Sequence, residues 1–340
     1  MLNFRNDYSS AAHPVVMDAL IHAGFQQTPG YGADPFCQEA ADNIRALCNC
    51  PGGAVHFLVG GTQVNKTAIA AFLRPYEAVI AASTAHICCH ETGAVEQDGH
   101  KIIACPAPDG KLTPDMVRSV VSSHDSEHTV LPRLLYVSNT TELGTVYSLP
   151  ELQALRRVAD ELKLYLYCDG ARLGSAIAAG DAALPDYAAL CDAFTIGGTK
   201  NGLLFGEALV IANPALQPGF RHCMKQQGAI LAKGQLLGIQ FNAILEDGRY
   251  FQLAAEANRL ARRLTEGLRE RNVPFLADSP SNQVFPILPD KVVKALAKEV
   301  AFEVQQRVDE SHTCIRFVTA WDTGSDAVEQ LLALLGRLLG

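Results

Sequence analysis

Short apolar runs alternate with amphipathic stretches from residue 55 to about residue 210. The runs are rich in Val, Ile, Leu and aromatic residues, and several of the stretches between them are long enough for a helix. This alternation is the pattern of repeated βαβ units, so we predict an α/β fold with a mainly parallel seven-stranded sheet. The expected strands lie at residues 55–59, 78–80, 101–103, 134–137, 165–168, 193–196 and 208–211.

The clearest helix between these runs begins near Pro150. Leu152, Leu155 and Val158 recur at the spacing of one helix face, with charged residues opposite, which is typical of a helix packed on a core. Pro150 favours a helix start because proline is tolerated in the first turn. We expect this helix to extend to Leu162.

The pattern changes after Pro218. Residues 225–271 predict long helices, among them one over 254–271 with Arg and Glu facing solvent. The remaining chain mixes strands and helices, which indicates a small α+β domain. Its expected strands lie at 284–287 and 314–318, and its expected helices lie near 290–308 and 325–339.

Length and composition fit a chain of two domains. The 340 residues exceed the roughly 100 to 200 residues of a usual single domain. We place a large domain, N-terminal arm included, at residues 1–245 and a small C-terminal α+β domain at residues 246–340. The 48% hydrophobic content is slightly more than a monomer needs to cover its own core, which indicates a buried subunit interface.

Charge and cysteine usage exclude several classes of function. A net charge of −8 without a cluster of Lys and Arg offers no attraction to nucleic acid or to an anionic membrane. The first residues lack a signal-peptide pattern, and no apolar run approaches the ~20 residues that span a bilayer, so we expect a cytoplasmic protein. The ten cysteines are then expected to be reduced thiols. Cys48 and Cys50, and the His and Cys run at 86–90, lack zinc-site spacing, so no metal is expected.

Polar groups follow four of the expected strands, and ligands of open α/β sheets bind just beyond the carboxyl ends of strands. Gly60-Gly61-Thr62-Gln63 follows the first strand and opens a helix. Its glycines free backbone N–H groups, the helix N-terminus attracts an anion, and Thr62 adds a donor, so the segment suits a phosphate. A tight turn with an ordinary helix cap is the alternative.

An acidic motif, Asp-Gly-Ala-Arg at residues 169–172, follows the strand at 165–168. A buried carboxylate at Asp169 can hold a proton on a heterocyclic nitrogen, as a pyridoxal ring requires for its role as an electron sink. A structural pair of Asp169 with Arg172, or a helix cap, is the alternative.

Lys200 lies in the segment Gly-Gly-Thr-Lys-Asn-Gly at residues 197–202, after the strand at 193–196. A structural surface lysine needs no glycines on both sides. A lysine amine whose pKa is lowered by burial forms imines with carbonyl compounds. A flexible hairpin with an exposed lysine is the alternative.

His86 follows the strand at 78–80 and can stack on a planar ring or relay protons, although a satisfied polar histidine is the alternative. Together, the four sites require a ligand with a phosphate, an aromatic face, a basic ring nitrogen and an aldehyde. Pyridoxal 5'-phosphate has all four, so we predict it as the cofactor.

With these motifs, the chain resembles the low-specificity L-threonine aldolases and related β-eliminating lyases, which are pyridoxal-phosphate-dependent and have the aspartate-aminotransferase-type fold (fold type I). The similarity extends from Phe4 to Thr323. Its most specific parts are Asp-Gly-Ala-Arg at 169–172 and Gly-Thr-Lys-Asn-Gly at 198–202, in tandem, together with Tyr-Gly-Ala-Asp-Pro at 31–35.

The resemblance implies a role for each cofactor-binding residue. Lys200 would be the Schiff-base lysine, Asp169 would face the pyridine nitrogen, and His86 would stack on the ring. Gly61 and Thr62 would hold the phosphate.

The resemblance also implies how the substrate and a second subunit take part. Arg172 and Arg316 would grip the carboxylate of a small amino-acid substrate, a task that suits a bidentate guanidinium. In the family the active site lies at a dimer interface and dimers often pair into tetramers, so a homodimer or homotetramer is expected. Tyr31 would enter the site of the neighbouring subunit.

Three positions depart from the family pattern. Asn6 stands where the family has a serine hydroxyl that touches the substrate carboxylate. Thr141 replaces the histidine of a Glu-Asn-Thr-His run that contacts the β-hydroxyl of the substrate. Lys225 is a candidate for the phosphate contact from the partner subunit, because Lys-Gln-Gln-Gly replaces a glycine triplet followed by Met-Arg-Gln.

The expected reaction is retro-aldol cleavage of a threonine-type L-3-hydroxy amino acid to glycine and an aldehyde, with His86 or a bound water as the base. β-Elimination, begun when Lys200 removes the Cα proton, is the alternative because Thr141 weakens the contact to the hydroxyl. A transaminase-like reaction is a third possibility. The intact set of Lys200, Asp169 and Arg316 disfavours a non-catalytic cofactor-binding scaffold.

Overall fold

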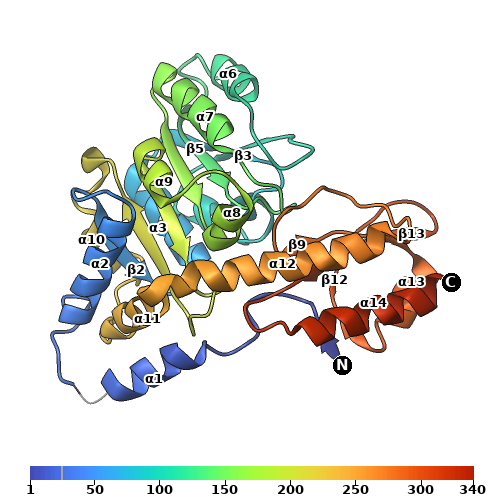
Figure 1. The fold of residues 1–340 in the computed structure, drawn as a ribbon. Helices are drawn as coiled ribbons and strands as arrows, with labels where there is room; N and C mark the ends of the chain where they lie inside the picture. The colour runs from blue at the N-terminus through green and yellow to red at the C-terminus, as the bar shows by residue number, and fades with distance from the viewer. Residues whose placement is uncertain (24–25) are drawn as a thin grey trace.

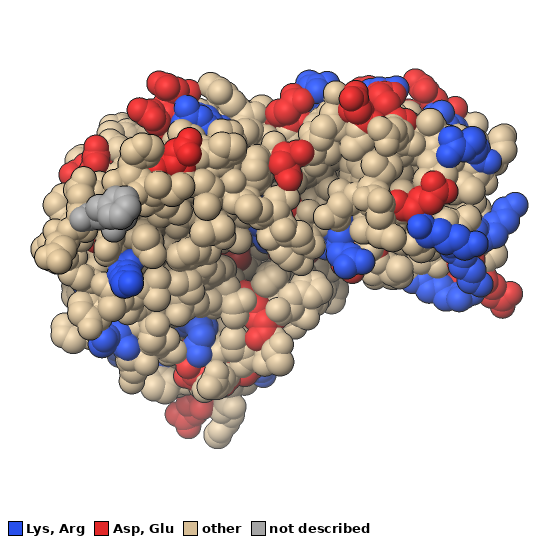
Figure 2. Space-filling model, turned by 90° about the horizontal axis from the view of Figure 1, so that it is seen from below, with Lys and Arg blue, Asp and Glu red and all other residues tan. Residues whose placement is uncertain are grey.

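The computed structural model describes residues 1–23 and 26–340. Figure 1 shows a larger lobe around a central sheet and a smaller lobe that contains the C-terminus, with the long helix α12 (Arg249–Arg269) running between them. The space-filling view in Figure 2 shows a recess where the two lobes meet, and broad uncharged areas on the larger lobe.

A seven-stranded sheet forms the centre of the larger lobe, which confirms the prediction. Its order is β2-β8-β7-β6-β5-β3-β4; β8 runs antiparallel to both neighbours, and the other pairs are parallel. Every residue of β3, β7 and β8 is buried, so the sheet is covered on both faces. The strands are β2 (Ala54–Leu58), β3 (Glu77–Ala82), β4 (Ile102–Cys105), β5 (Leu131–Ser138), β6 (Tyr165–Asp169), β7 (Ala193–Gly197) and β8 (Glu207–Ile211).

The helix expected from Pro150 is confirmed as α7 (Leu149–Glu161). Ser148 caps it through reciprocal hydrogen bonds with Glu151, which satisfy backbone N–H groups at its start. The other helices of the larger lobe are α1 (Pro14–Ala23), α2 (Pro35–Leu47), α3 (Gly61–Phe72), α4 (His86–Cys89), α5 (Ala94–Gln97), α6 (Pro114–Ser122), α8 (Leu173–Ala179), α9 (Leu184–Leu190), α10 (Phe220–Gln226) and α11 (Gln235–Leu245), with short 3-10 turns at Pro214–Leu216 and Glu246–Gly248.

Helix α12 joins the two hydrophobic cores. Tyr250, near its start, packs in the core of the larger lobe, whereas Leu260 and Leu264 belong to the core of the smaller lobe. The expected domain boundary at residue 245 therefore falls one short turn before a helix that both lobes share. Across residues 1–23 and 26–340, neither α12 nor any other helix is long and apolar enough to cross a membrane.

The N-terminal arm begins in the smaller lobe rather than in the large domain, where we expected it. Strand β1 (Leu2–Asn3) pairs in parallel with β11 (Val300–Ala301). Phe4 is fully buried in the smaller core, edge-on to Phe317, because its apolar partners lie on that side.

The smaller lobe confirms the α+β prediction but corrects two of its elements. The helix expected near 290–308 is wrong beyond α13 (Asp290–Leu296), because β12 (Glu303–Arg307) pairs antiparallel with β13 (His312–Val318). Pairing with a neighbouring strand here outweighs local propensity. The strand expected at 284–287 is divided into two short strands. The remaining elements are β9 (Gln283–Val284), β10 (Ile287–Pro289) and α14 (Ser325–Leu339).

Candidate active site

Asp169 ends β6, between β5 and β7 at the carboxyl edge of the sheet. Its Oδ2 atom accepts hydrogen bonds from Asn65 Nδ2 at 2.9 Å and from the Tyr136 hydroxyl at 2.6 Å. Its Oδ1 atom accepts the backbone N–H of Ala171 at 2.9 Å. Asp169 is 6% exposed, and three donors fix the orientation of its carboxylate.

Asn65 connects Asp169 to a second buried acid, Glu91. The Nδ2 group of Asn65 also donates to Glu91 Oε1 at 2.8 Å, and its Oδ1 accepts the Tyr167 hydroxyl at 2.9 Å. Asn65 is 1% exposed and Glu91 is 5% exposed. The two acids are therefore held in one hydrogen-bonded network beneath the site.

His86 begins α4 and is held by the same network, with Nδ1 at 2.8 Å from Glu91 Oε1. Burial alone would lower the pKa of His86, but the hydrogen bond to Glu91 and the nearby carboxylates of Glu142 and Asp169 raise it above its ordinary value. Because Nδ1 is fixed, Nε2 and the ring face are left for a ligand.

Lys200 lies just beyond β7, the strand next to β6. The loops that follow these strands touch through glycines. A Cβ at Gly197 would lie 2.4 Å from the Ala171 carbonyl oxygen, and a Cβ at Gly170 would lie 2.0 Å from the Thr195 carbonyl oxygen. Side chains at these positions would separate the loops, so glycine is required for their close approach.

The surroundings of Lys200 suit an amine nucleophile. Burial lowers the pKa of Lys200, and the nearby Arg172 guanidinium lowers it further. A lower pKa leaves more of the neutral amine, which is the form that attacks a carbonyl carbon. The Tyr250 hydroxyl donates to the Gly197 carbonyl at 2.9 Å, and Asn201 Nδ2 donates to the Tyr250 carbonyl at 2.7 Å, so the loop is anchored to α12.

Arg172 forms a bidentate ion pair with Asp7 of the N-terminal arm, with Nε at 2.7 Å and Nη2 at 3.0 Å from the two carboxylate oxygens. Asn282 Nδ2 donates to the same carboxylate at 2.9 Å. Burial would raise the pKa of Asp7, but the charges of Arg172 and Lys200 hold it below its ordinary value. Two of the three guanidinium nitrogens of Arg172 are thus occupied.

Arg316, on β13 of the smaller lobe, lies close enough to Arg172 and Glu142 for their charges to act on it. Burial lowers its pKa, and Arg172 lowers it further. Its buried Nε has no hydrogen-bond partner among the described residues. A partly buried guanidinium near another one favours an anion, and a carboxylate matches its geometry.

The N-terminus of α3 offers a second place for an anion. The helix begins at Gly61 without a side-chain cap, so its first backbone N–H groups lack intrahelical partners. Within the described residues, no atom lies within 4 Å of where a Cβ would sit on Gly60 or Gly61, and Thr62 is exposed. Free donors beside open space suit a phosphate group.

Tyr31 and Lys225 lie together on the surface of the larger lobe. Lys225 Nζ is 4.8 Å from the centre of the Tyr31 ring, and Arg221 Nη2 donates to the Tyr31 carbonyl at 2.9 Å. Tyr31 is 50% exposed. Neither Tyr31 nor Lys225 lines the cavity beside Lys200.

Thr141 and Asn6 were both predicted to contact the substrate. They differ in whether their polar side-chain atoms are already engaged in hydrogen bonds. The Thr141 hydroxyl lies 2.7 Å from that of Thr145 and accepts the N–H of Leu143 at 3.3 Å, and the residue is 2% exposed. Thr141 is therefore engaged within its own loop. Asn6 uses its Oδ1 to accept the N–H of Tyr8 at 3.1 Å, and this leaves its amide nitrogen as a donor.

Glu207 is a buried acid that the sequence analysis missed. It lies on β8 opposite Gly197 and accepts the backbone N–H of Gly198 at 3.0 Å. Burial raises its pKa to about 7. The carboxyl group therefore holds the start of the loop that carries Lys200, through its hydrogen bond with Gly198.

Asn65, Glu91 and Tyr136 were also missed. Asn65 is a polar residue four positions after Gly61, on the buried face of α3, and this was a usable signal. Glu91 and Tyr136 carry no such signal, because their importance comes from contacts between distant segments. The cysteines are all free thiols, and the described part of the chain contains no group of three His, Cys, Asp or Glu residues placed to hold a metal ion.

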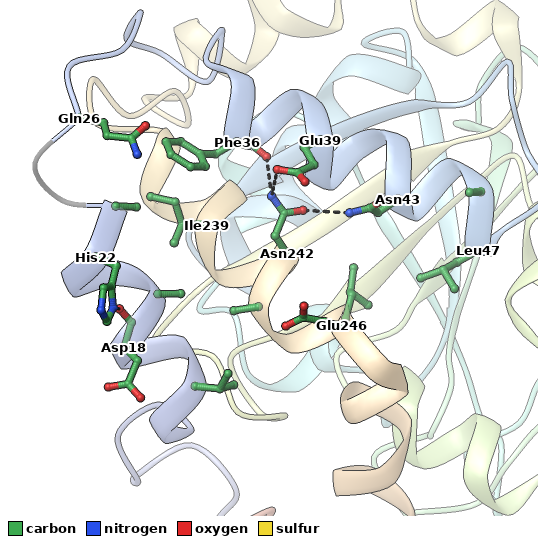
Figure 3. A pocket seen from close by; sticks show the side chains of 16 residues that line it. Asp18, His22, Gln26, Phe36, Glu39, Asn43, Leu47, Ile239, Asn242 and Glu246 are labelled. Atoms are coloured by element: carbon green, nitrogen blue, oxygen red, sulfur yellow. Dashed lines mark hydrogen bonds between the residues drawn. The ribbon is translucent and has the colours of Figure 1, made fainter.

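A groove of about 860 Å³ lies between α1, α2 and α11, and none of the predicted site residues lines it. Figure 3 shows the apolar side chains of Phe36, Leu47 and Ile239 around this groove. By contrast, Lys200 and Arg172 line a cavity of only about 20 Å³, which is room for about one water molecule. This cavity is therefore too small for a cofactor.

Comparison with known proteins gives consistent matches over the whole chain. The family model for β-eliminating lyases matches residues 3–319. The low specificity L-threonine aldolase of Pseudomonas aeruginosa is 32% identical over 99% of this chain and 98% of its own length. The solved threonine aldolase of Leishmania major is 42% identical, covers 100% of both chains and superposes with a TM-score of 0.99. The aspartate aminotransferase of Thermus thermophilus, at 17% identity and a TM-score of 0.72 over 99% of this chain and 91% of its own, shares the fold.

Proposed function

Because the chain belongs to the β-eliminating lyase family, we propose that it is a pyridoxal-phosphate-dependent lyase of the threonine aldolase type. It cleaves L-3-hydroxy amino acids, such as threonine or allo-threonine, to glycine and an aldehyde. One observation carries this proposal: Asp169 ends β6 and Lys200 closely follows the neighbouring strand β7, and the two segments touch through Gly170 and Gly197. The threonine aldolase names of the relatives from Pseudomonas aeruginosa and Leishmania major support it.

The residues around Lys200 fit pyridoxal phosphate. The uncapped start of α3 at Gly61 and the exposed Thr62 would hold the phosphate, and Asp169 would hold the ring nitrogen. His86 would stack on the ring, and the Lys200 amine would bind the aldehyde. When bound, the cofactor supplies an electron sink for the pair released at the substrate Cα.

The chain's own side chains would orient the substrate and move its protons. Arg316 would bind the substrate carboxylate, because its buried Nε has no protein partner in the described chain. Arg172, already held by Asp7, would provide a fixed positive charge beside it. Asn6 would donate to the same carboxylate. The reaction also needs a base for the β-hydroxyl proton, for which His86 or a bound water was the expectation from the sequence.

β-Elimination by the same site is a second candidate function. It is favoured by the state of Thr141, whose hydroxyl is engaged by Thr145 and so is not available to the β-hydroxyl of a substrate. In that reaction the Lys200 amine would remove the Cα proton, and a β-substituent would leave to give a keto acid and ammonia.

We further propose a homodimer or homotetramer whose active sites lie at the dimer interface. Helix α1 exposes Met17 and Ile21, and the groove between α1, α2 and α11 is lined partly by apolar side chains, among them Phe36, Leu47 and Ile239. The uncharged areas of the larger lobe in Figure 2 are consistent with a covered surface. Tyr31 and Lys225 would then reach the site of the partner subunit. The cytoplasmic location stays a prediction.

The decisive experiment incubates the purified protein with pyridoxal phosphate and L-threonine, L-allo-threonine or L-phenylserine, and measures glycine. We expect glycine and the matching aldehyde. Ammonia and a keto acid without glycine would replace the aldolase proposal with β-elimination. A protein that stays colourless, and in which borohydride fixes no cofactor on Lys200, would contradict both.

A further inference from the structure

Glu142 lies in the loop after β5, at the same edge of the sheet as Asp169. Two backbone hydrogen bonds of 2.9 Å close this loop, from the Thr141 N–H to the Thr145 carbonyl and from the Gly144 N–H to the Thr141 carbonyl. The position of Glu142 is therefore set by a tight, hydrogen-bonded turn.

The turn buries the neighbours of Glu142 but not Glu142 itself. Thr141 and Leu143 are 2% and 8% exposed, whereas Glu142 is partly exposed. Its carboxylate makes no hydrogen bond or ion pair with any residue in the described ranges 1–23 and 26–340, while the Thr141 hydroxyl is already engaged. Of the side chains at this turn, Glu142 therefore has oxygens available to a ligand.

The charge of Glu142 reaches the centre of the candidate site. It acts to raise the pKa of His86, Lys200, Arg172 and Arg316. Contacts of the turn agree with this: a Cβ on Gly110 would lie 3.1 Å from Thr141 and 3.5 Å from Thr84 Oγ1, so the turn packs beside the loop that leads to His86. The turn also adjoins two other parts of the site. Ser138, at the end of β5, pairs with Asp169. The Thr141 carbonyl accepts a hydrogen bond of 3.5 Å from Gln283 of β9, the strand that pairs with β13 and so with the strand of Arg316.

We propose that Glu142 is a catalytic residue that accepts the proton of the substrate's β-hydroxyl. The proposal rests on the function proposed above. The O–H bond breaks, its proton moves to a Glu142 oxygen, and its electron pair becomes the second C–O bond of the aldehyde. The Cα–Cβ bond breaks, and its pair stays on Cα, which takes up one proton to give glycine. Glu142 then returns its proton to solvent.

His86 is less suited to this step. Its Nδ1 is held by Glu91, and its raised pKa means that a larger fraction of the ring is protonated at neutral pH. A protonated imidazole cannot accept a proton, whereas a free carboxylate can. The charged groups that face His86 are Glu91, Glu142, Asp169 and Lys200, so a change at Glu142 should be visible in the titration of His86.

The first test compares Glu142→Gln with the parent in two reactions of the holoenzyme. Cleavage of L-threonine needs a base for the β-hydroxyl, whereas exchange of the glycine Cα proton in D2O does not. We expect glycine production to fall by about 100-fold or more and glycine exchange to stay within about twofold. Glu142→Asp keeps the carboxylate and should retain part of the cleavage activity.

The matched control is Glu303→Gln. Glu303 is a partly exposed acid that also acts on the pKa of Arg316 but pairs with Arg5 on the surface. The Glu303→Gln variant should catalyse both reactions at rates within about twofold of the parent. Cleavage by Glu142→Gln within about threefold of the parent would overturn the proposal, and so would an equal loss of cleavage and exchange. A parent that produces no glycine would instead overturn the proposed function and this role with it.

The second test uses the protein without cofactor or substrate. The His86 ring of protein labelled with ¹³C-histidine is titrated by NMR in the parent, Glu142→Gln and Glu303→Gln. We expect the His86 pKa to be lower in Glu142→Gln than in the other two. An unchanged His86 pKa in Glu142→Gln would mean that the carboxylate does not face the site, and would overturn the proposal.

Discussion

The carboxylate of Asp7 holds Nε and Nη2 of Arg172 at 2.7 and 3.0 Å, although 165 residues separate the two in the chain. Both side chains are almost fully buried. The pair neutralises one of two arginines that act on each other at the site, and Arg316 is left with its Nε unpaired in the described structure. The arrangement separates a fixed guanidinium from one that is ready for a substrate carboxylate.

Replacing Asp7 with Asn should destabilise the protein strongly. The change leaves Arg172 buried without its counter-charge, and breaking such a pair from one side costs about 3–5 kcal/mol. The free energy of unfolding from urea titration at pH 7 measures this loss. The control Asp42→Asn removes an exposed partner of Arg45 and should leave the unfolding midpoint unchanged. A fully stable Asp7→Asn protein would contradict the importance of the pair.

Glu207 should make stability fall as the pH rises. Its pKa is about 7 in the folded protein against the ordinary 4.5, so the folded state binds a proton between these values that the unfolded state has released. The contribution of Glu207 to the free energy of unfolding is therefore most favourable below about pH 4.5, and it declines by roughly 3 kcal/mol up to pH 7. Glu207→Gln, which mimics the protonated acid, should remove this decline in unfolding experiments at pH 5 and pH 8.

The control for Glu207 is Glu329→Gln on the surface, where the carboxylate is 55% exposed. This variant should follow the parent at both pH values. If Glu207→Gln lost the same stability as the parent between pH 5 and pH 8, the buried acid would not be the cause.

Gly197→Ala should separate the two loops that carry Lys200 and Asp169. The new Cβ would lie 2.4 Å from the backbone oxygen of Ala171, and backbone cannot move aside as a flexible side chain can. We expect a loss of about 1–3 kcal/mol in unfolding free energy, together with weaker borohydride fixation of the cofactor. Gly52→Ala places its new Cβ more than 4 Å from every atom of residues 1–23 and 26–340, so it should change neither quantity.

Arg316→Leu should act on substrate binding more than on turnover. Losing a charge-assisted hydrogen bond to the substrate carboxylate should raise KM for L-threonine by about 10- to 100-fold, measured from steady-state glycine production. Arg316→Lys keeps the charge without the bidentate geometry, so its KM should lie between those of the parent and of Arg316→Leu. The exposed Arg307 provides the control, because its replacement by Leu should leave KM unchanged. An unaltered KM in Arg316→Leu would assign the carboxylate to another group.

Much of the fold could be read from the sequence because buried parallel strands are continuous apolar runs. Every residue of β3, β7 and β8 is buried, and each strand was visible as such a run. The strand β12 was not visible, because Glu303–Arg307 is polar and becomes a strand only by pairing with β13. The N-terminal arm was misplaced for a similar reason, since its partner β11 lies about 300 residues away.

The candidate site divides in the same way. Lys200 and Asp169 could be predicted from local sequence motifs, because the close approach of their backbone segments requires glycine beside them. The groups that hold them do not: Tyr136 reaches Asp169 from a neighbouring strand, and Glu207 reaches the lysine loop across an antiparallel pair. Such contacts depend on the order of strands in the sheet, which no local pattern encodes.

The N-terminal arm, described above as the partner of β11 and Arg172, also touches the larger lobe, where the His13 N–H donates to the Gly202 carbonyl at 2.8 Å. Phe4 is anchored in one lobe and His13 in the other, with Asp7 fixed between them. The stretch from Phe4 to His13 is therefore a tether of set length. Adding or removing a residue between Phe4 and Asp7 would shift the Asp7 carboxylate relative to Arg172, even if every side chain that touches the site were kept.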